Sequence, residues 1–161
     1  VSPRYHFVAV EMETVPLDID CGDGVVVRLT GTMDRARIRK SQHGVGIADL
    51  KSGAAAVQKK VANTKGHGPQ IGTYELLYEH STGQQITDEA EIIGLKTMGT
   101  PEIGTGAIRN AKRVMLGTDE RPGLIEFAAR MFRSGDFYPN SRSLLCSPKY
   151  CPRHGTCHFH E

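Results

Sequence analysis

The stretch that decides the fold is GTMDRARIRKSQHGVGIADLKSG, residues 31–53. It holds two runs of β-forming residues separated by a turn near His43, which predicts two antiparallel strands. Asp49 and Lys51 are two residues apart on the second strand, so they project to the same face. Asp34 lies on the first strand, which runs back beside the second. We therefore expect two carboxylates and one ammonium to converge at one place on a sheet.

Two carboxylates beside an ammonium suit the hydrolysis of phosphodiesters. Carboxylate oxygens bind hard divalent ions such as Mg²⁺ or Mn²⁺, and such ions neutralise a phosphate and activate water. Lys51 can orient or deprotonate that water, and the backbone carbonyl of Leu50 is a candidate further ligand. The simpler alternative is a surface Asp–Lys pair, which does little. The position of Asp34 and the glycine turn after Lys51 favour a site.

Further strands and helices are expected around this pair. Strands are predicted at residues 5–12, 25–40 with a bend at Gly31, 45–51 and 91–98. Helices are predicted at residues 54–62, 70–80 and 122–134, and a loop rich in glycine and threonine is expected after residue 98. The first three strands read as an antiparallel meander. This order of strands and helices indicates an α/β domain with one mixed sheet.

Composition is that of an ordinary globular protein. The 161 residues suit one domain, with 39% apolar and 24% charged residues. No apolar run approaches the roughly 20 residues of a membrane span, so we expect no membrane contact. We expect a cytoplasmic protein, in the host cytoplasm if the sequence is phage-encoded.

Charge is distributed unevenly along the chain. Residues 1–108 carry 11 Lys and Arg against 13 Asp and Glu, a net charge of −2. Residues 109–153 carry 9 against 4, a net charge of +5. An acidic part suited to cations and a basic part suited to phosphates are compatible with a nucleic-acid enzyme.

Three motifs together resemble the RecB-like exonuclease family of the PD-(D/E)XK nuclease superfamily. GTMDRAR resembles its G-x-x-D-R motif, and IADLKSG resembles its D-x-K-T-G motif. Gln70 and Tyr74 match its Q-x-x-x-Y motif and lie on one side of the following helix. The resemblance implies a restriction-endonuclease-like core, a central mixed sheet flanked by helices. It implies catalytic roles for Asp34, Asp49 and Lys51, with Gln70 positioning the lysine or DNA; for Tyr74, ordinary helix packing is an equal alternative.

The resemblance also has a gap at the start of the chain. These nucleases place another metal-site residue on a helix before the first strand, and this sequence begins almost at that strand. The resemblance therefore implies a nuclease core at residues 1–138 that lacks its N-terminal helical part, followed by an irregular tail at residues 139–161. Glu11 or Glu13 could supply the missing carboxylate from the first strand.

Cysteines gather in this tail. Cys146, Cys151 and Cys157 lie within the last sixteen residues, which favours a reducing compartment and a metal site. Their pattern resembles the C-terminal triple cysteine of iron–sulfur nucleases, such as the CRISPR-associated RecB-like enzymes, which implies a [4Fe–4S] cluster with Cys21 as a candidate fourth ligand. Zinc with His154 as fourth ligand is the alternative, and free thiols are a third. We expect the three cysteines to lie close together and near the sheet.

These observations predict a Mg²⁺- or Mn²⁺-dependent deoxyribonuclease, an exonuclease acting in recombination, repair, phage replication or CRISPR adaptation. Its expected partners are DNA and a recombination or helicase protein. One alternative is a catalytically inactive nuclease-like DNA-binding module with a structural metal site. Another is an unrelated zinc-binding interaction domain. The presence of Asp34, Asp49 and Lys51 together favours the enzyme.

Overall fold

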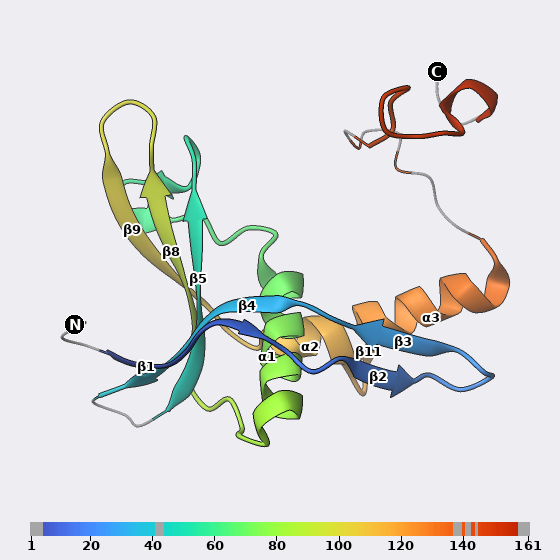
Figure 1. Ribbon diagram of the computed structural model, residues 1–161, viewed down its shortest axis with the longest axis horizontal. Coiled ribbons are helices and arrows are strands. Elements are labelled where there is room, and N and C mark those ends of the chain that lie inside the picture. The colour runs from blue at the N-terminus through green and yellow to red at the C-terminus, as the bar shows by residue number, and fades with distance from the viewer. Residues whose placement is uncertain (1–4, 41–43, 137–139, 141–142, 144, 158–161) are drawn as a thin grey trace.

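A seven-stranded mixed sheet forms the centre of the molecule (Figure 1). The computed structural model describes residues 5–40, 44–136, 140, 143 and 145–157. In spatial order the strands are β1 (Tyr5–Glu13), β4 (Thr32–Arg39), β5 (Val45–Ser52), β8 (Ala90–Lys96), β9 (Glu102–Ile108), β7 (Val61–Ala62) and β6 (Val57–Gln58). The pairs β5–β8 and β7–β9 are parallel and the others antiparallel. The predicted α/β class with one mixed sheet is confirmed.

The remaining elements lie outside this sheet. They are the hairpin of β2 (Leu17–Asp20) and β3 (Val26–Leu29), the hairpin of β10 (Gly117–Thr118) and β11 (Arg121–Pro122), the helices α1 (Gly68–Thr82), α2 (Ala111–Leu116) and α3 (Leu124–Ser134), and the 3₁₀ turn η1 (His154–Thr156). Among the residues described, no helix has the length and apolarity needed to span a membrane.

Helix α1 covers one face of the sheet and closes the hydrophobic core. Pro69 stands in its first turn, where the missing amide proton costs nothing, and Gly83 ends it with a φ of 70°. Ile71 of the helix packs with Ile47 of β5 and Ile92 of β8, and all three are fully buried. The core therefore ties α1 to the two parallel strands, and the helix predicted at residues 70–80 is confirmed.

The predicted strand at residues 25–40 is two strands. β3 pairs with β2 outside the main sheet, whereas β4 pairs with both β1 and β5. The break falls at residues 30–31, where the predicted bend at Gly31 lies. The antiparallel meander is confirmed as β1–β4–β5, although residues 41–43 of its second turn lie outside the described part.

The helix predicted at residues 54–62 is wrong, because this segment forms the β6–β7 hairpin. The cause is tertiary packing, which overrides a good local helix propensity. The hairpin lies directly on two glycines: a Cβ at Gly94 would stand 2.5 Å from the Ala56 oxygen, and one at Gly104 would stand 2.7 Å from the Lys60 oxygen. Gly104 belongs to β9, which the sequence had indicated as a loop because glycines weaken the strand pattern. The same glycines, having no side chain, leave room for the β6–β7 hairpin.

Helices α2 and α3 follow the sheet. α2 was not predicted, whereas the helix predicted at residues 122–134 is present from Leu124 onward. α3 buries only Ile125 and Ala129 and leaves Phe127 and Phe132 at least half exposed. It leads from the sheet domain toward the tail, whose described residues lie apart from the sheet (Figure 1). The predicted domain boundary after residue 138 falls in residues 137–139, outside the described part.

Candidate functional site

The divergence of two neighbouring strands creates the site. β4 and β5 pair as far as Arg35 opposite Ala48 and then separate, while β4 continues to pair with β1 (Figure 1). Continuing that register by one residue brings Asp34 opposite Asp49, and residues opposite each other share a face. Asp34 bridges the opening, since its Oδ2 accepts a hydrogen bond of 3.2 Å from the Leu50 amide. The two carboxylates expected to converge are thus neighbours across this opening.

Asp49 is connected to α1 by a chain of polar contacts. The Lys51 ammonium lies 2.7 Å from Asp49 Oδ2. The same ammonium donates a hydrogen bond of 2.8 Å to Gln70 Oε1, and Gln70 Nε2 donates one of 2.9 Å to the Tyr74 hydroxyl. Because Gln70 and Tyr74 are four residues apart on a helix, the helix holds both toward the lysine. The geometry places all five predicted side chains around one opening.

The carboxylate of Asp49 is buried with a single cation beside it. Its residue is 1% exposed, the Lys51 ammonium lies 2.7 Å from Oδ2, and Oδ1 has no hydrogen-bond partner among the described residues. Burial raises the pKa of Asp49 above its ordinary value; Lys51 lowers that pKa, and the nearby charge of Asp34 raises it further. A buried carboxylate oxygen without a donor is costly, so this position favours a bound cation.

One residue near the site was not predicted from the sequence. His67 immediately precedes α1, and it is close enough to Asp49 for its charge to lower the pKa of that carboxyl. The signal in the sequence was the segment Gly66–His67–Gly68–Pro69, which was interpreted only as a break before the helix. A histidine at the start of the helix that carries Gln70 adds a further polar side chain to the surroundings of Asp49.

The donor set for a metal ion consists of two carboxylates rather than a closed cage. Among the described residues, no group of three or more His, Cys, Asp or Glu side chains is arranged to hold an ion. A backbone oxygen can extend the pair, because the N–H and C=O of a strand residue project to the same side. The Leu50 amide faces Asp34, so its carbonyl faces the same opening. Asp34, Asp49 and this carbonyl therefore fit a hard divalent ion that keeps water or phosphate as its other ligands.

The alternative carboxylates on β1 lie beside Asp34, on the strand next to this opening. In the β1–β4 register, Val10 pairs with Arg35 and Met12 with Met33, so Glu11 falls opposite Asp34. Glu11 is exposed and has a left-handed backbone with a φ of 47°. Glu13 pairs with Thr32 and is also exposed. Neither is part of a metal-binding group among the described residues.

The cysteine tail does not form the expected cluster. Cys21, Cys146, Cys151 and Cys157 are free, half-buried thiols. The tail segment 145–157, which carries the three cysteines, lies beyond α3 and apart from the main sheet (Figure 1), so the structure does not place it near the sheet as predicted. No metal-binding group of His, Cys, Asp or Glu occurs among the described residues, His154 included.

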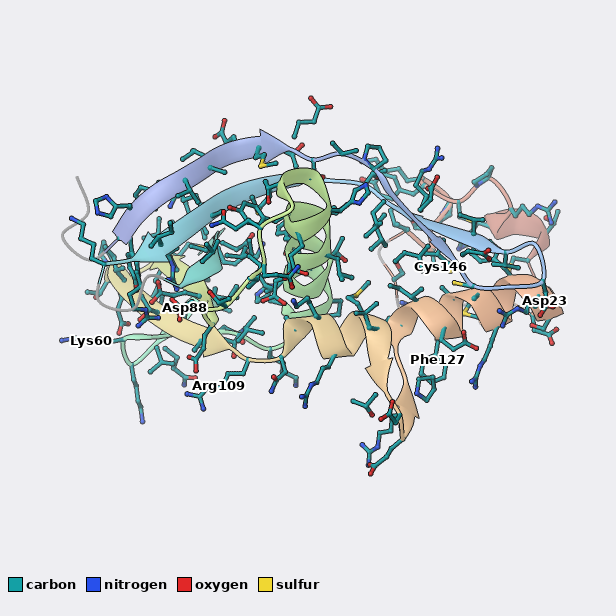
Figure 2. The ribbon with its side chains drawn as sticks, turned by 90° about the horizontal axis from the view of Figure 1, so that it is seen from below. Asp23, Lys60, Asp88, Arg109, Phe127 and Cys146 are labelled. Carbon is teal, nitrogen blue, oxygen red and sulfur yellow. The ribbon has the colours of Figure 1, made fainter. Side chains whose placement is uncertain are left out.

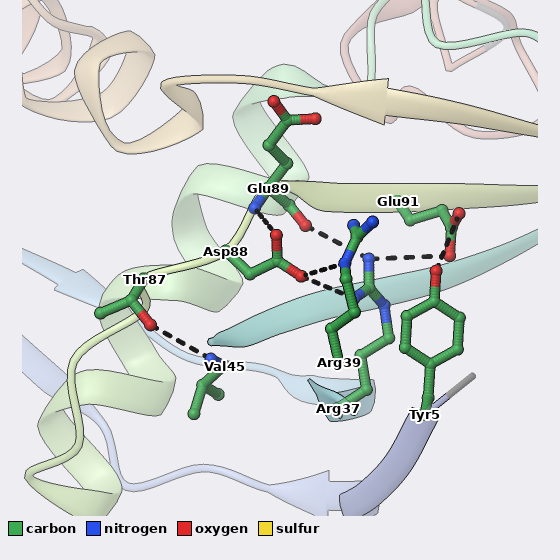
Figure 3. A network of polar contacts seen from close by, with 8 residues as sticks. All are labelled: Tyr5, Arg37, Arg39, Val45, Thr87, Asp88, Glu89 and Glu91. Carbon is green, nitrogen blue, oxygen red and sulfur yellow. Dashed lines mark hydrogen bonds and ion pairs between the residues drawn. The ribbon is translucent and has the colours of Figure 1, made fainter. Parts of the chain in front are cut away.

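A second buried polar cluster lies on the opposite face of the sheet (Figure 3). Arg37 pairs with Gly46, an odd number of residues from Asp49 on β5, so Arg37 and Asp49 are on different faces. Its guanidinium is 1% exposed and lies 3.0 Å from Asp88 and 3.6 Å from Glu91. Arg39 also contacts Asp88 at 3.0 Å. This cluster ties β4 to the start of β8 across β5.

The ring of Tyr5 completes this second cluster. The Arg37 guanidinium lies 4.2 Å from the centre of the ring, and the Tyr5 hydroxyl donates a hydrogen bond of 3.5 Å to Glu91. Gly46 makes room for the cluster, since a Cβ there would stand 2.8 Å from the Glu89 oxygen. β1, β4 and β8 are thereby held together on the face that α1 does not cover.

Comparison with known proteins supports one family. The model of the PD-(D/E)XK nuclease superfamily matches residues 2–158. A search of curated proteins finds no match.

Two solved structures are similar at low identity. The protein SSO0001 is 17% identical, with a TM-score of 0.48, over 95% of this chain and 60% of its own length. A protein from Eubacterium rectale that carries the provisional name exonuclease is 16% identical, with a TM-score of 0.47, over 93% of this chain and 53% of its own length. The chain thus spans little more than half the length of either protein.

Proposed function

Because the chain belongs to the PD-(D/E)XK nuclease superfamily, we propose that it is a divalent-metal-dependent deoxyribonuclease that degrades DNA from an end. The observation that carries the proposal is the buried carboxylate of Asp49, which lies opposite Asp34, has Lys51 at 2.7 Å from Oδ2, and leaves Oδ1 without a partner among the described residues. A carboxylate left in this state has little use in a purely structural site. Lys51 contacts this carboxylate, and Gln70 and Tyr74 follow Lys51 in a chain of hydrogen bonds from the helix.

The acidic side of the site would hold the ion. Asp34, Asp49 and the Leu50 carbonyl face the opening between β4 and β5, and they are the residues proposed to bind Mg²⁺ or Mn²⁺. When bound, such an ion supplies charge that neutralises the scissile phosphate and activates the attacking water. Burial of Asp49 strengthens its attraction for the ion, because the local dielectric constant is lower than that of water.

The basic side of the site would act on the water and the transition state. Lys51 reaches the opening from the same face as Asp49, and its ammonium can donate to the attacking water or to a phosphate oxygen. Gln70 Oε1 accepts a hydrogen bond from this ammonium and so limits its rotation. The Tyr74 hydroxyl in turn holds Gln70 by accepting a hydrogen bond from Nε2. We therefore assign Lys51 to chemistry and the two helix residues to its positioning.

The wider role follows from the family resemblance. We propose that the activity serves recombination, repair, phage replication or CRISPR adaptation, together with a recombination or helicase protein. The uneven charge supports a DNA substrate, because nine Lys and Arg lie within residues 109–153. The two-domain division, with a core to residue 138 and a tail after it, remains part of the proposal.

A digestion time course tests the function. End-labelled linear DNA and covalently closed circular DNA are incubated with Mg²⁺, Mn²⁺ or EDTA. We expect loss of label from linear DNA with either ion, none with EDTA, and resistance of the circle. Asp49→Asn should abolish cleavage, whereas Asp119→Asn, an exposed acid in the β10–β11 turn, should cleave as the natural protein does.

Two results would contradict parts of this proposal. Cleavage of the circle at the same rate as the linear DNA would replace the exonuclease with an endonuclease. Binding of DNA without cleavage under any of the metal conditions would indicate the inactive DNA-binding module instead.

A further inference from the structure

The connection between the two catalytic elements is an unusually basic segment. It runs from Lys51 on β5 to Gln70 on α1 and contains the β6–β7 hairpin. Residues 52–69 include three lysines and one histidine and no aspartate or glutamate. A segment without any acidic residue beside a proposed phosphodiester site is suited to contact with a polyanion.

This segment encloses a hollow of about 530 Å³. Its apolar wall is made of small side chains, namely Ala54, Ala55, Val57, Val61 and Ala62. Val57 and Ala62 are buried in the wall, whereas Ala54, Ala55 and Val61 are exposed at its opening. The hollow thus has a wall of small apolar side chains beside polar groups, is open to solvent, and is large enough for a flat heterocycle.

Polar groups stand at the edge of the hollow. Gln58 and Asn63 supply two carboxamides, and Lys96 supplies an ammonium. Asn63 Oδ1 accepts a hydrogen bond from the Lys65 amide, which leaves its amide group directed elsewhere. Within the described residues, Lys96 makes no ion pair, although Glu102 stands opposite it in the β8–β9 register. Carboxamides can donate and accept at the edge of any base, and the ammonium can contact a phosphate.

The tip of the hairpin is strained, and two lysines bear the strain. Lys59 and Lys60 have φ values of 51° and 63°, both in the left-handed region. A two-residue turn of this kind usually takes Asn and Gly, because other side chains are unfavourable there. Glu102, an acid close to the tip, accepts a hydrogen bond from the backbone amide of Lys60. The side-chain ammonium of Lys60 makes no ion pair among the described residues. Figure 2 shows Lys60 extending from this end of the molecule.

The hollow lies on the same face as the proposed catalytic residues and next to them. Lys51 pairs with Gly94 in the parallel β5–β8 ladder, and paired residues share a face. The Val57 side chain lies directly over Gly94, where a Cβ would stand 2.7 Å from it. Adjacent strands are about 4.8 Å apart, so the wall of the hollow begins one strand away from Lys51.

We propose that this hollow binds an unpaired nucleobase of the nucleotide next to the scissile phosphate, while Lys59, Lys60 and Lys96 contact the flanking phosphates. This inference rests on the proposed nuclease function and adds its substrate class, a single-stranded DNA end. A base can enter the hollow only when it has left its pair and its stack. The wall is aliphatic and the carboxamides can both donate and accept, so the hollow accepts any base.

Binding measured without cleavage tests this site separately from the nuclease function. Fluorescence anisotropy of a labelled twelve-nucleotide single strand is recorded in EDTA, beside a blunt hairpin duplex of equal length. The natural protein should bind the single strand about tenfold more tightly than the duplex. Ala55→Leu, which adds bulk at an exposed position of the wall, should reduce binding of the single strand about tenfold and leave duplex binding unchanged.

The lysine contact has its own measurement and control. Lys96→Ala should reduce the dependence of log affinity on log salt concentration by about 0.7 for a single strand, the loss expected for one phosphate contact. Arg121→Ala removes an exposed cation on β11 and should leave binding by the hollow unchanged. A single strand lacking all its bases should bind the natural protein and Ala55→Leu equally weakly.

Equal affinity for single strand and duplex, together with full binding by Ala55→Leu, would overturn the proposal. Ala54→Leu gives a second test of the wall at another exposed position. Absence of cleavage with Mg²⁺ and Mn²⁺ would instead refute the nuclease function, because the binding experiment contains no divalent ion.

Discussion

Asp49 on β5 and Asp88 just before β8 are aspartates with little-exposed side chains, and their surroundings have opposite effects on the pKa. The side chain of Asp49 is 1% exposed and that of Asp88 is 8% exposed. Burial raises the pKa of Asp49 above its ordinary value. Burial acts in the same direction on Asp88, but hydrogen bonds from Arg39 and Arg37 outweigh it and lower the pKa of that carboxyl. The two clusters therefore differ in how many donors reach the acid.

The number of donors around each acid distinguishes a binding site from an ion-pair cluster that only stabilises the fold. Asp88 receives two guanidinium groups and a backbone amide, so its charge is compensated without any ligand. Asp49 has a single ammonium, that of Lys51, and its Oδ1 has no hydrogen-bond partner among the described residues. A buried carboxylate with one oxygen left unpaired is unfavourable in the folded chain alone. Its retention points to a partner from outside, which agrees with the proposed cation.

The largest expected difference concerns cleavage. Lys51→Ala should reduce the cleavage rate about a thousandfold and leave DNA binding nearly unchanged, because one ammonium acts on the transition state whereas binding is spread over many phosphates. Arg37→Met, on the other face, should keep the rate of the folded protein within about fivefold, since Arg37 does not reach the opening. Single-turnover rates at saturating metal measure both. Undiminished cleavage by Lys51→Ala would remove the lysine from the mechanism.

The next effect concerns stability and falls on the other cluster. Asp88→Ala should lower the free energy of unfolding by about 3 kcal/mol, because it leaves the buried Arg37 guanidinium without its closest carboxylate. Urea denaturation followed by circular dichroism measures this. Asp119→Ala, at an exposed turn, is the control and should change stability little. A loss equal to that of the control would show that Arg39 and Arg37 are satisfied by other groups.

Both the successes and the failures of sequence reasoning have physical causes. Asp34, Asp49, Lys51, Gln70 and Tyr74 could be predicted because strand alternation, helix spacing and motif order all apply within one short region. The β6–β7 hairpin could not, because AAAVQKKVA favours a helix and only its contact with Gly94 and Gly104 makes it a hairpin.

The Arg37–Asp88 cluster and the position of the tail could not be predicted from the sequence for other reasons. Alternating arginines at positions 35, 37 and 39 are typical of a solvated strand face, and nothing local shows that Asp88 covers Arg37 from fifty-one residues away. The cysteine cluster was inferred from spacing, and spacing does not reveal that the tail lies beyond α3.

A smaller effect should appear when the charge of Asp49 is removed. Asp49→Asn should raise the free energy of unfolding in EDTA by about 1 kcal/mol, since a neutral amide is less costly to bury than a carboxylate without donors. Thermal unfolding should then shift upward by about 2–4 °C, although the same variant cannot cleave. Asp88→Asn is the matched control and should be destabilised. A destabilised Asp49→Asn would show that the Lys51 ion pair stabilises the folded chain on balance.

The smallest effect concerns Glu75, a buried acid that has more donors than Asp49 has at Oδ1 and fewer than Asp88 has. It is 5% exposed, and its Oε2 accepts one hydrogen bond of 3.1 Å from the Lys112 amide. Burial raises the pKa of Glu75 above its ordinary value, and the Lys112 amide only partly opposes this. The folded chain then holds this proton more tightly than the unfolded chain does. Stability from this group is complete below the unfolded pKa of about 4.5 and is lost as pH rises through the folded pKa.

Glu75→Gln should remove that part of the pH dependence, because glutamine keeps an oxygen for the Lys112 amide and does not ionise. Urea denaturation from pH 4 to pH 8 should show a gain for Glu75→Gln that grows with pH and stays below the roughly 1 kcal/mol expected for Asp49→Asn. The Asp88→Asn protein should instead show a loss that is already nearly complete at pH 4, because the pKa of Asp88 is lowered and its carboxylate stabilises the folded chain fully above the unfolded pKa. A gain for Glu75→Gln that is constant with pH would mean that Glu75 ionises equally in both states. One hydrogen-bond donor would then be enough to offset the rise in pKa that burial causes. The difference in pKa direction between Asp49 and Asp88 would then depend on whether a first donor reaches the carboxylate, not on how many do.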